Sequence, residues 1–439
     1  MLQISTADPK RLLAARRALA HIRQRLDLKI AFELWDGSLV PEGAPQHSLR
    51  VAIASETALP VLLRSPRLKT LIRLYAENAI DIRGGSLFDL ANQRPALSTR
   101  EMRRRLDKTF LAKAILPFLF ASGRPFPGSE FKQLDGGDSA NKGRGSGRDD
   151  IAFHYDVSNR FYQLFLDSQM VYTCGYFREW ANDLDIAQRD KLDMICRKLR
   201  LRPGEQLLDI GCGWGALVCH AAEHYGVTAL GVTLSAEQIA LARQRILERG
   251  LQDRVRVELQ DYRTVAGPFD KIASIGMFEH VAIDNHEVYF RKINALLRPR
   301  GLYLHHAITR KGKASEKAFR RKRPEYDAMT RYIFPGAEVD HIGMSIRNLE
   351  GYGFEVHDAE NWREHYARTT ELWAHRLMAN REAAVAEVGE ARYRLWVLYL
   401  SGVSLAFSRG TLQIFQTLAS KRSKGASGLP PTREDLYRD

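Results

Sequence analysis

The 439-residue chain is poor in cysteine and has neither a long apolar run nor an excess of acidic residues. Its four cysteines, Cys174, Cys196, Cys212 and Cys219, form no C-x-x-C pair, and none lies in the N-terminal third. This pattern argues against a disulfide framework or a zinc site and fits a reducing compartment. The longest apolar stretch, residues 395–407, contains polar residues and is too short for a transmembrane span. The first residues lack a basic region followed by an apolar core, so we expect no secretory signal.

The chain carries a formal net charge of +14, with 27% charged and 45% hydrophobic residues. Such an excess attracts polyanions, either nucleic acid or an anionic membrane surface. A solubilising surplus of charge is an equal alternative. The run 310–323 bears on the partner of this charge because it holds eight basic residues and only one acid, Glu316. It is either a solvated loop or a contact for phosphate head groups.

Residues 1–122 predict a small α+β domain without a catalytic constellation. The basic amphipathic stretch 100–113 is either a lipid-docking surface helix or a helix that packs on its own domain. Residues 123–150 are rich in Gly, Ser, Asp and Lys and predict a flexible linker. The remaining elements follow from apolar periodicity: helices over 10–28 and 59–79, and strands over 29–35, 48–54 and 80–85.

A second domain is predicted over 151–425, followed by a polar tail at 426–439. Its central feature is the apolar run 207–210, which leads into Gly211, Gly213 and Gly215. A buried parallel strand that ends in a tight turn before a helix has this pattern. Strands then alternate with helices, which predicts an α/β fold with a mostly parallel sheet. The expected strands cover 228–232, 255–259, 271–275 and 302–307, and the expected helices cover 188–201, 216–224, 236–249 and 285–296.

In such sheets ligands bind beyond the carboxyl ends of the strands. The rule places five segments around one pocket. Glycine lets the backbone approach a ligand closely, so the G-x-G-x-G turn suits a nucleoside-like ligand. A purely structural turn is the alternative. The segments are 211–215, 233–234, 261–262, 276–280 and 305–308.

Several separated motifs together resemble the cyclopropane-fatty-acyl-phospholipid synthase family of S-adenosylmethionine-dependent methyltransferases. The resemblance is close over about residues 153–420 and loose over the N-terminal domain. It implies a class I methyltransferase-like (Rossmann-like) sheet with helical insertions for the lipid site. The motifs are Y-T-C-G-Y-F (172–177), L-D-I-G-C-G-W-G (208–215), G-V-T-L-S-A-E-Q (231–238), Q-D-Y-R (260–263), S-I-G-M-F-E-H-V (274–281) and Y-I-F-P-G (332–336).

By this resemblance, the methyl group of S-adenosylmethionine passes to the cis double bond of an unsaturated phospholipid acyl chain. The resulting carbocation loses a proton to a bound bicarbonate ion, and a cyclopropane ring closes. The implied cofactor-binding residues are Tyr172, Thr173, Gly211, Gly213, Thr233, Leu234, Gln238, Asp261, Tyr262 and Ile275. The implied catalytic residues are Cys174, Glu279, His306, Ile308 and Tyr366.

The alkene is itself the nucleophile in this reaction, so we interpret Cys174 as a wall of the anion pocket. Glu279 either orients His306 or, if protonated, holds the anion. His305 and His306 must point to opposite faces of their strand, so only one of them faces the site. Asp209 is expected to brace the glycine turn or to reach the cofactor through water. A third ligand near Glu279 and His280 is missing, so no metal is expected.

Aromatic faces stabilise a carbocation. The candidates are Tyr155, Phe161, Tyr172, Tyr176, Phe278 and Tyr366. Core packing is the alternative for any of them and is at least as good an interpretation for Phe161 and Phe278.

Three other functions remain open at this point. The cation could lose its proton elsewhere and give a methyl-branched or methylene fatty acid. The charge would also suit an RNA or DNA methyltransferase, but no Asn/Asp-Pro-Pro-Tyr-type tetrapeptide occurs, and we expect no nucleic acid partner. A non-catalytic lipid-binding protein would not need Glu279 or the glycines. We therefore expect a cytoplasmic enzyme, peripherally associated with the inner, anionic face of the membrane, and the resemblance suggests a homodimer.

Overall fold

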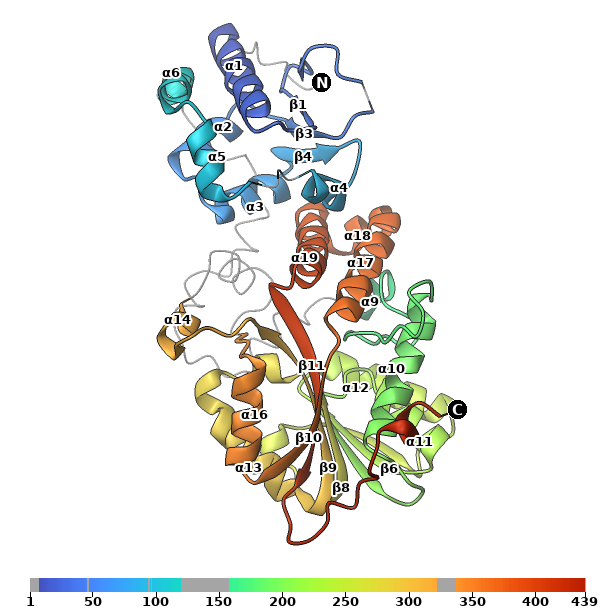
Figure 1. Ribbon diagram of the computed structural model, residues 1–439. Helices are drawn as coiled ribbons and strands as arrows, with labels where there is room; N and C mark the ends of the chain where they lie inside the picture. The colour runs from blue at the N-terminus through green and yellow to red at the C-terminus, as the bar shows by residue number, and fades with distance from the viewer. Residues whose placement is uncertain are drawn as a thin grey trace. The chain divides into compact units, whose positions relative to one another are not determined.

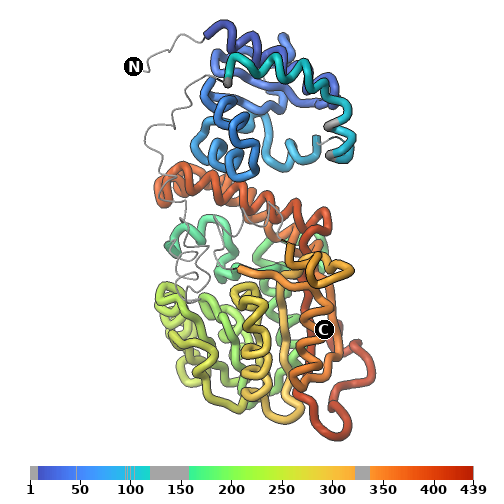
Figure 2. The backbone as a smooth tube through the Cα atoms, turned by 90° about the vertical axis from the view of Figure 1, so that its left-hand side faces the viewer, coloured from blue at the N-terminus to red at the C-terminus, as the bar shows by residue number. Residues whose placement is uncertain are grey.

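The computed structural model describes residues 8–45, 47–93, 95, 97–119, 158–321 and 337–438. The chain divides into two compact units (Figures 1 and 2). Unit 1 is Met1–Asp135 with Gly389–Ser401, and unit 2 is Gly136–Val388 with Gly402–Asp439. The predicted linker 123–150, Tyr155 and the motif 332–336 lie outside the described residues.

Unit 1 has a four-stranded sheet in the order β2-β1-β3-β4. The pair β1–β3 is parallel, and the other pairs are antiparallel. Apolar side chains from the sheet and from helices on it form its core, with Leu19 of α1, Phe32 of β1 and Leu74 of α3 among them. The elements are α1 (Pro9–Arg25), β1 (Ala31–Glu33), β2 (Leu39–Val40), β3 (Arg50–Ile53), α2 (Ala58–Arg64), α3 (Leu68–Ala76), β4 (Ile80–Arg83), α4 (Leu87–Asn92), α5 (Thr99–Arg105) and α6 (Lys108–Leu119).

The single helix predicted over 59–79 is two helices, α2 and α3. Pro66 explains the break. A proline disfavours the helical conformation in the residue before it, and Ser65 has φ −140° and ψ 77°. The apolar periodicity of the two short helices is nearly continuous, so the pattern alone suggests one.

The basic stretch 100–113 forms α5 and the first half of α6. Helix α6 packs on its own unit: Phe110 stacks on His21 of α1 with ring centroids 4.6 Å apart, and Phe118 is buried in the core. Leu116 is 53% exposed. One apolar side chain of this helix therefore faces solvent while others hold it to the unit.

Unit 1 also contains residues 389–401, which the sequence analysis placed in the catalytic domain. They begin helix α19 (Glu390–Ser408). Arg394, 7% exposed, donates to the carbonyl oxygens of Tyr75 and Ile80 at 2.6 and 3.2 Å and to Asp81 Oδ1 at 2.8 Å. A buried guanidinium with this many acceptors fixes the returning segment against α3 and β4.

Unit 2 has a seven-stranded sheet in the order β10-β11-β9-β8-β5-β6-β7. Strands β5 to β9 pair in parallel, whereas β11 pairs antiparallel with both β9 and β10. The predicted α/β class with a mostly parallel sheet is confirmed. The strands are β5 (Gln206–Ile210), β6 (Thr228–Thr233), β7 (Val255–Leu259), β8 (Phe269–Ile275), β9 (Leu297–Arg310), β10 (Phe354–Asn361) and β11 (Leu412–Lys421).

Helices cover both faces of this sheet (Figure 1). One core contains side chains of α10 (Leu184–Lys198), α11 (Ala216–Tyr225) and α12 (Ala236–Glu248). The other contains side chains of α13 (His286–Leu296) and α16 (Ile342–Gly351). The remaining helices of unit 2 are α9 (Asn159–Gln163), α14 (Glu316–Arg320), α17 (Arg363–Ala379) and α18 (Arg381–Val388), with short 3-10 turns at Tyr262–Thr264, Phe278–His280, Ile283–Asn285 and Glu434–Leu436.

The polar tail packs on unit 2. Leu436 is 2% exposed, Asp435 accepts two hydrogen bonds from Arg200, and Arg433 donates to Asp358 at 2.6 Å. No helix among the described residues is long and apolar enough to cross a membrane.

Candidate active site

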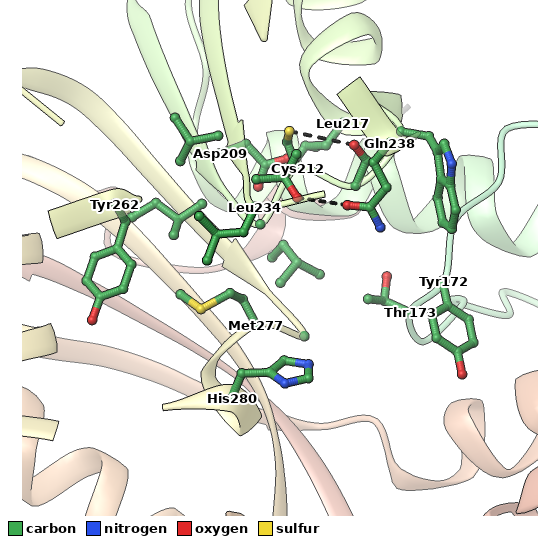
Figure 3. A pocket seen from close by; sticks show the side chains of 18 of the residues that line it. Tyr172, Thr173, Asp209, Cys212, Leu217, Leu234, Gln238, Tyr262, Met277 and His280 are labelled. Carbon is green, nitrogen blue, oxygen red and sulfur yellow. Dashed lines mark hydrogen bonds between the residues drawn. The ribbon is translucent and has the colours of Figure 1, made fainter. Parts of the chain in front are cut away.

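A cavity of about 820 Å³ opens at the carboxyl ends of β5, β6, β7 and β8 (Figure 3). Strand ends meet at this edge because the four strands are parallel. All ten residues predicted to bind the cofactor line the cavity, and Tyr262 lies on the opposite side from Tyr172 and Thr173 in Figure 3. The set is Tyr172, Thr173, Gly211, Gly213, Thr233, Leu234, Gln238, Asp261, Tyr262 and Ile275.

The glycine turn lies on the floor of this cavity. Gly211 and Gly213 have φ of +83° and +54°, a region that other residues rarely adopt. A Cβ on Gly211 would meet the Met277 side chain at 2.9 Å, whereas a Cβ on Gly213 would meet nothing within 4 Å. Gly213 thus lines the cavity and has open space where a side chain would stand.

Gln238 presents a hydrogen-bond donor to the cavity. Its Oε1 accepts from Thr233 Oγ1 at 2.8 Å, and the hydroxyl oxygen of Thr233 in turn accepts from the backbone N–H of Ser235. The carbonyl end of the amide is thus occupied, and its nitrogen points toward the cavity in Figure 3. Such a donor suits the ribose or adenine of a nucleoside.

Asp261 stands on the rim with its charge already neutralised. Both carboxyl oxygens accept from the guanidinium of Arg263, at 3.0 Å from Nε to Oδ1 and 2.6 Å from Nη2 to Oδ2. A bidentate pair of this kind fixes the carboxylate in one orientation. The pair orients the carboxylate of the predicted cofactor contact.

Lys191 and Asp209 also line the cavity, although the sequence analysis did not assign them to the cofactor set. Lys191 Nζ donates to Thr173 Oγ1 at 2.9 Å, and Gln188 on the same helix donates to the Thr173 carbonyl at 2.8 Å. Burial lowers the pKa of Lys191 to about 8 and raises that of Asp209 to about 7, while Lys191 opposes the rise at Asp209. The sequence contained a signal for the burial of this lysine, since Lys191 lies on the apolar face of a helix.

The five predicted catalytic residues do not line this cavity, and three of them neighbour residues that do. Cys174 follows Thr173, Glu279 lies between two lining residues of its loop, and His306 pairs with Ile275 across β8 and β9. Ile308 comes two residues after His306 on β9, and Tyr366 lies on α17.

Glu279 is tied to Ile308. Its Oε1 accepts from the backbone N–H of Ile308 at 2.6 Å, and its Oε2 is buried without a hydrogen-bond partner among residues 158–321 and 337–438. Burial raises the pKa of Glu279 to about 7, although the Ile308 hydrogen bond opposes the rise. At His306 Nδ1 the neighbouring group is the Gln416 amide and not Glu279.

Trp362 contacts the other three predicted catalytic residues, Cys174, His306 and Tyr366. The backbone carbonyl of this fully buried residue accepts a long contact from Cys174 Sγ, 3.8 Å away, and the Tyr366 N–H donates to the same oxygen at 3.0 Å. Its ring packs edge-on against His306 at 5.5 Å and stacks on Tyr176 at 4.8 Å. The sequence analysis missed Trp362, which nothing local in the sequence distinguishes from core.

His305 and His306 point to opposite faces of β9, as strand alternation predicts. The Nδ1 of His305 is 3.0 Å from the Tyr303 hydroxyl, and its ring packs edge-on against Phe278 in one core. His306 faces Gln416 and Trp362 on the other side. Burial lowers the pKa of His305 to about 3 and that of His306 well below its usual value.

Among the aromatic candidates, Phe278 belongs to the core that α13 covers. Phe161 is fully buried and packs against Tyr162 and Phe165. Core packing is thus the role the structure gives to both. Among the residues of known placement, no group of three His, Cys, Asp or Glu side chains is arranged to hold a metal ion.

Comparisons with known proteins agree with this geometry. A family model described as mycolic acid cyclopropane synthetase matches residues 144–417. A probable fatty acid methyltransferase of Pseudomonas putida is 45% identical over 291 residues, which is 66% of this chain and 73% of that protein. The cyclopropane-fatty-acyl-phospholipid synthase of Escherichia coli (strain K12) is 36% identical over 268 residues, 61% of this chain and 66% of that enzyme.

Two solved structures are similar over nearly their whole length. The cyclopropane synthase MmaA2 from Mycobacterium tuberculosis superposes with a TM-score of 0.59 at 33% identity, covering 62% of this chain and 98% of that one. The mycolic acid cyclopropane synthase CmaA1, complexed with SAH and CTAB, gives 0.59 at 33% identity, covering 63% and 99%. The fold and the cavity define an S-adenosylmethionine-dependent methyltransferase. Within that class, the chain belongs to the mycolic acid cyclopropane synthetase family.

Proposed function

We propose that the enzyme transfers the methyl group of S-adenosylmethionine to the cis double bond of an unsaturated phospholipid acyl chain and closes a cyclopropane ring. The observation that carries the proposal is that two buried polar atoms, Glu279 Oε2 and His306 Nε2, have no partner among the described residues. The His306 ring packs against Trp362, whose carbonyl accepts from the Tyr366 N–H. A transient carbocation requires surroundings without positive charge and a nearby base. His306 and Trp362 provide uncharged walls, and Glu279 does so when it is protonated.

The cofactor residues fit S-adenosylmethionine. The missing side chain of Gly213 leaves room for the cofactor, and Gln238 offers a hydrogen-bond donor. The buried Asp209 has one carboxyl oxygen, Oδ1, without a partner in the described part of the chain. When bound, the cofactor supplies an electrophilic methyl group. The bond from sulfur to that carbon breaks as a bond to one alkene carbon forms, and the other alkene carbon becomes the cation.

Ring closure then needs a proton to leave the transferred carbon. Its C–H electrons form the second ring bond, and the proton goes to a small anion, which we propose is bicarbonate. Glu279 and His306 would hold this anion, and Cys174 and Tyr366 would border it. The Ile308 N–H favours the carbonyl form of the Glu279 oxygen that it contacts, so a protonated Glu279 donates through Oε2. The pKa of the buried carboxyl is about 7, so the group is mostly protonated below that pH.

Lipid analysis tests the reaction. The protein would be expressed in a host without cyclopropane fatty acids, with Glu279→Gln as the inactive control, and fatty acid methyl esters would be compared by mass spectrometry. Cyclopropane and methylene products both gain one CH2, but mild hydrogenation adds two hydrogens only to the methylene product. We expect a ring that resists it. A product that takes up two hydrogens would establish the methylene alternative, and a saturated methyl-branched chain would be heavier from the start.

We also propose that the enzyme meets its substrate at an anionic membrane surface. Lys311, Lys313 and Lys317 are exposed, and such lysines attract acidic lipid head groups. Not all of the basic run is available, since Arg310 lies over the Phe319 ring at 3.8 Å and Arg320 pairs with Glu316. Sedimentation with phosphatidylglycerol vesicles should fall when the three lysines become glutamine, and unchanged sedimentation would contradict the proposal.

A further inference from the structure

A chain of hydrogen bonds runs from β10 to His306. Lys198, at the end of α10, forms an ion pair with Glu360 of β10 and donates from Nζ to Gln416 Oε1 at 2.7 Å. Gln416 Nε2 is 2.9 Å from His306 Nδ1. Gln416 and His306 are direct partners across β11 and β9, and Lys198, Gln416 and His306 are each at most 1% exposed.

The direction of each bond follows from what the groups can do. An ammonium group only donates, so the carbonyl end of the Gln416 amide must face Lys198. The NH2 end then faces His306 and can only donate. His306 Nδ1 must therefore offer its lone pair, and the proton of a neutral imidazole must be on Nε2.

The surroundings keep the imidazole neutral. Burial and the positive charges of Lys191 and Lys198 hold the pKa of His306 well below its usual value, with a smaller effect from His305. The ring edge of Trp362 fixes the imidazole plane, and Lys198 lies 5.0 Å from the centre of the same indole. His306 Nε2 is buried and has no partner within the described ranges.

We infer that Lys198 and Gln416 are positioning residues that lock His306 in the Nε2–H tautomer, so that His306 acts as a hydrogen-bond donor and never as the base. This inference rests on the proposed function in one respect only: the group that the His306 N–H faces is taken to be the small anion. The N–H of His306 and the O–H of Glu279 would then be two neutral donors. They bind a small anion without adding a positive charge that would oppose a carbocation. The base must be the anion itself.

Gln416→Glu is a nearly isosteric test because it replaces the donor with an acceptor. The new carboxylate still accepts from Lys198, and its second oxygen accepts from Nδ1–H of His306. The tautomer should reverse. Gln413→Glu is the matched control, since it makes the same change on the same strand at a half-buried position for which the structure gives no bond to His306.

Nitrogen-15 NMR of histidine-labelled full-length protein reads the tautomer directly, with His306→Ala used to assign the signal. We expect a pyrrole-like Nε2 and a pyridine-like Nδ1 in the wild type and in Gln413→Glu. We expect the opposite pattern, or an imidazolium, in Gln416→Glu. A pyrrole-like Nδ1 in the wild type would overturn the inference, and this result does not depend on the folding of Gln416→Glu.

Turnover supplies the second measurement. Gln416→Glu should lose on the order of 100-fold in kcat, the size of one catalytic donor, with unchanged affinity for S-adenosylhomocysteine. Lys198→Met should give a mixture of tautomers and a smaller loss. Full activity of Gln416→Glu with a reversed tautomer would refute the donor role. If His306→Ala keeps full activity while the wild-type tautomer is as expected, the anion-binding role of His306 fails and the lock stands. If the wild type shows the expected tautomer but no turnover of acyl chains, the proposed function fails and the lock stands.

Discussion

The carboxyl group of Glu279 accepts the backbone N–H of Ile308 at 2.6 Å and remains close to neutral in spite of that bond. A hydrogen bond from a backbone amide lowers a carboxyl pKa, yet burial dominates here and the pKa of Glu279 lies near 7. The Glu279 carboxyl group can therefore gain or lose a proton close to physiological pH.

This pKa shift predicts how stability depends on pH. The folded state holds the Glu279 proton up to about pH 7, whereas the unfolded chain releases it near 4.5. Between these values the folded state binds more protons, so the contribution to the free energy of unfolding falls as pH rises. The full difference is about 3 kcal/mol.

Glu279→Gln removes this dependence. Relative to the wild type, the variant should therefore gain about 3 kcal/mol of stability between pH 4.5 and pH 8. Urea denaturation of the cofactor-free protein at several pH values measures it. A constant difference between the two proteins across that range would contradict the assigned pKa.

Glu279→Gln and His306→Ala should separate binding from chemistry. Neither residue lines the cofactor cavity, so affinity for S-adenosylhomocysteine should stay within about twofold by titration calorimetry. Turnover should fall by roughly 100-fold or more, which is typical of a lost proton-transfer or anion-binding group. Normal turnover in both variants would show that the anion pocket is assigned wrongly.

Gly213→Ala should weaken cofactor binding by at least about tenfold, or ~1.4 kcal/mol. The added methyl group occupies the open space over the turn, and alanine is strained at φ +54°. Gly204→Ala is the control, because Gly204 has φ +83°, a Cβ added there would meet nothing within 4 Å, and the residue has no place in the cavity. It should show similar backbone strain, roughly 1–2 kcal/mol, with unchanged affinity. Equal affinity losses in both variants would mean that strain, not the cavity, explains the effect.

Trp362→Leu should destabilise the protein by about 3–5 kcal/mol, as other large aromatic truncations in cores do. It removes the stack on Tyr176 and the edge contact with His306 together. The control, Trp180→Leu, changes a side chain that is 53% exposed and should cost about 0.5 kcal/mol. Thermal denaturation compares the stabilities of the two variants. A similar loss of stability in both would contradict the structural importance given to Trp362.

The cofactor half of the site could be predicted from the sequence because its signals are local. An apolar strand followed by Gly211 and Gly213 identifies the turn, and the parallel sheet brings the other strand ends to the same edge. That rule placed Thr233 and Asp261 on one cavity with Tyr262 although they come from different segments. Motif resemblance added Tyr172 and Thr173, which lie outside the sheet.

The support for His306 could not be predicted in this way. Gln416 reaches it through the antiparallel pairing of β11 with β9, Lys198 comes from the end of α10, and Trp362 precedes α17. No local pattern connects positions so far apart, and each taken alone looks like a strand, helix or core residue. The tautomer of a histidine depends on its neighbours in space, which periodicity does not give.

Arg394 binds Tyr75, Ile80 and Asp81 from a helix that begins at residue 390. A ribosome that has made the first 122 residues has therefore not yet made all of the unit to which they belong. The N-terminal segment therefore lacks the buried guanidinium of Arg394 until almost the entire chain has been synthesised. Truncation after residue 122 would expose the acceptors of this guanidinium, so a fragment that ends there lacks part of its own interior.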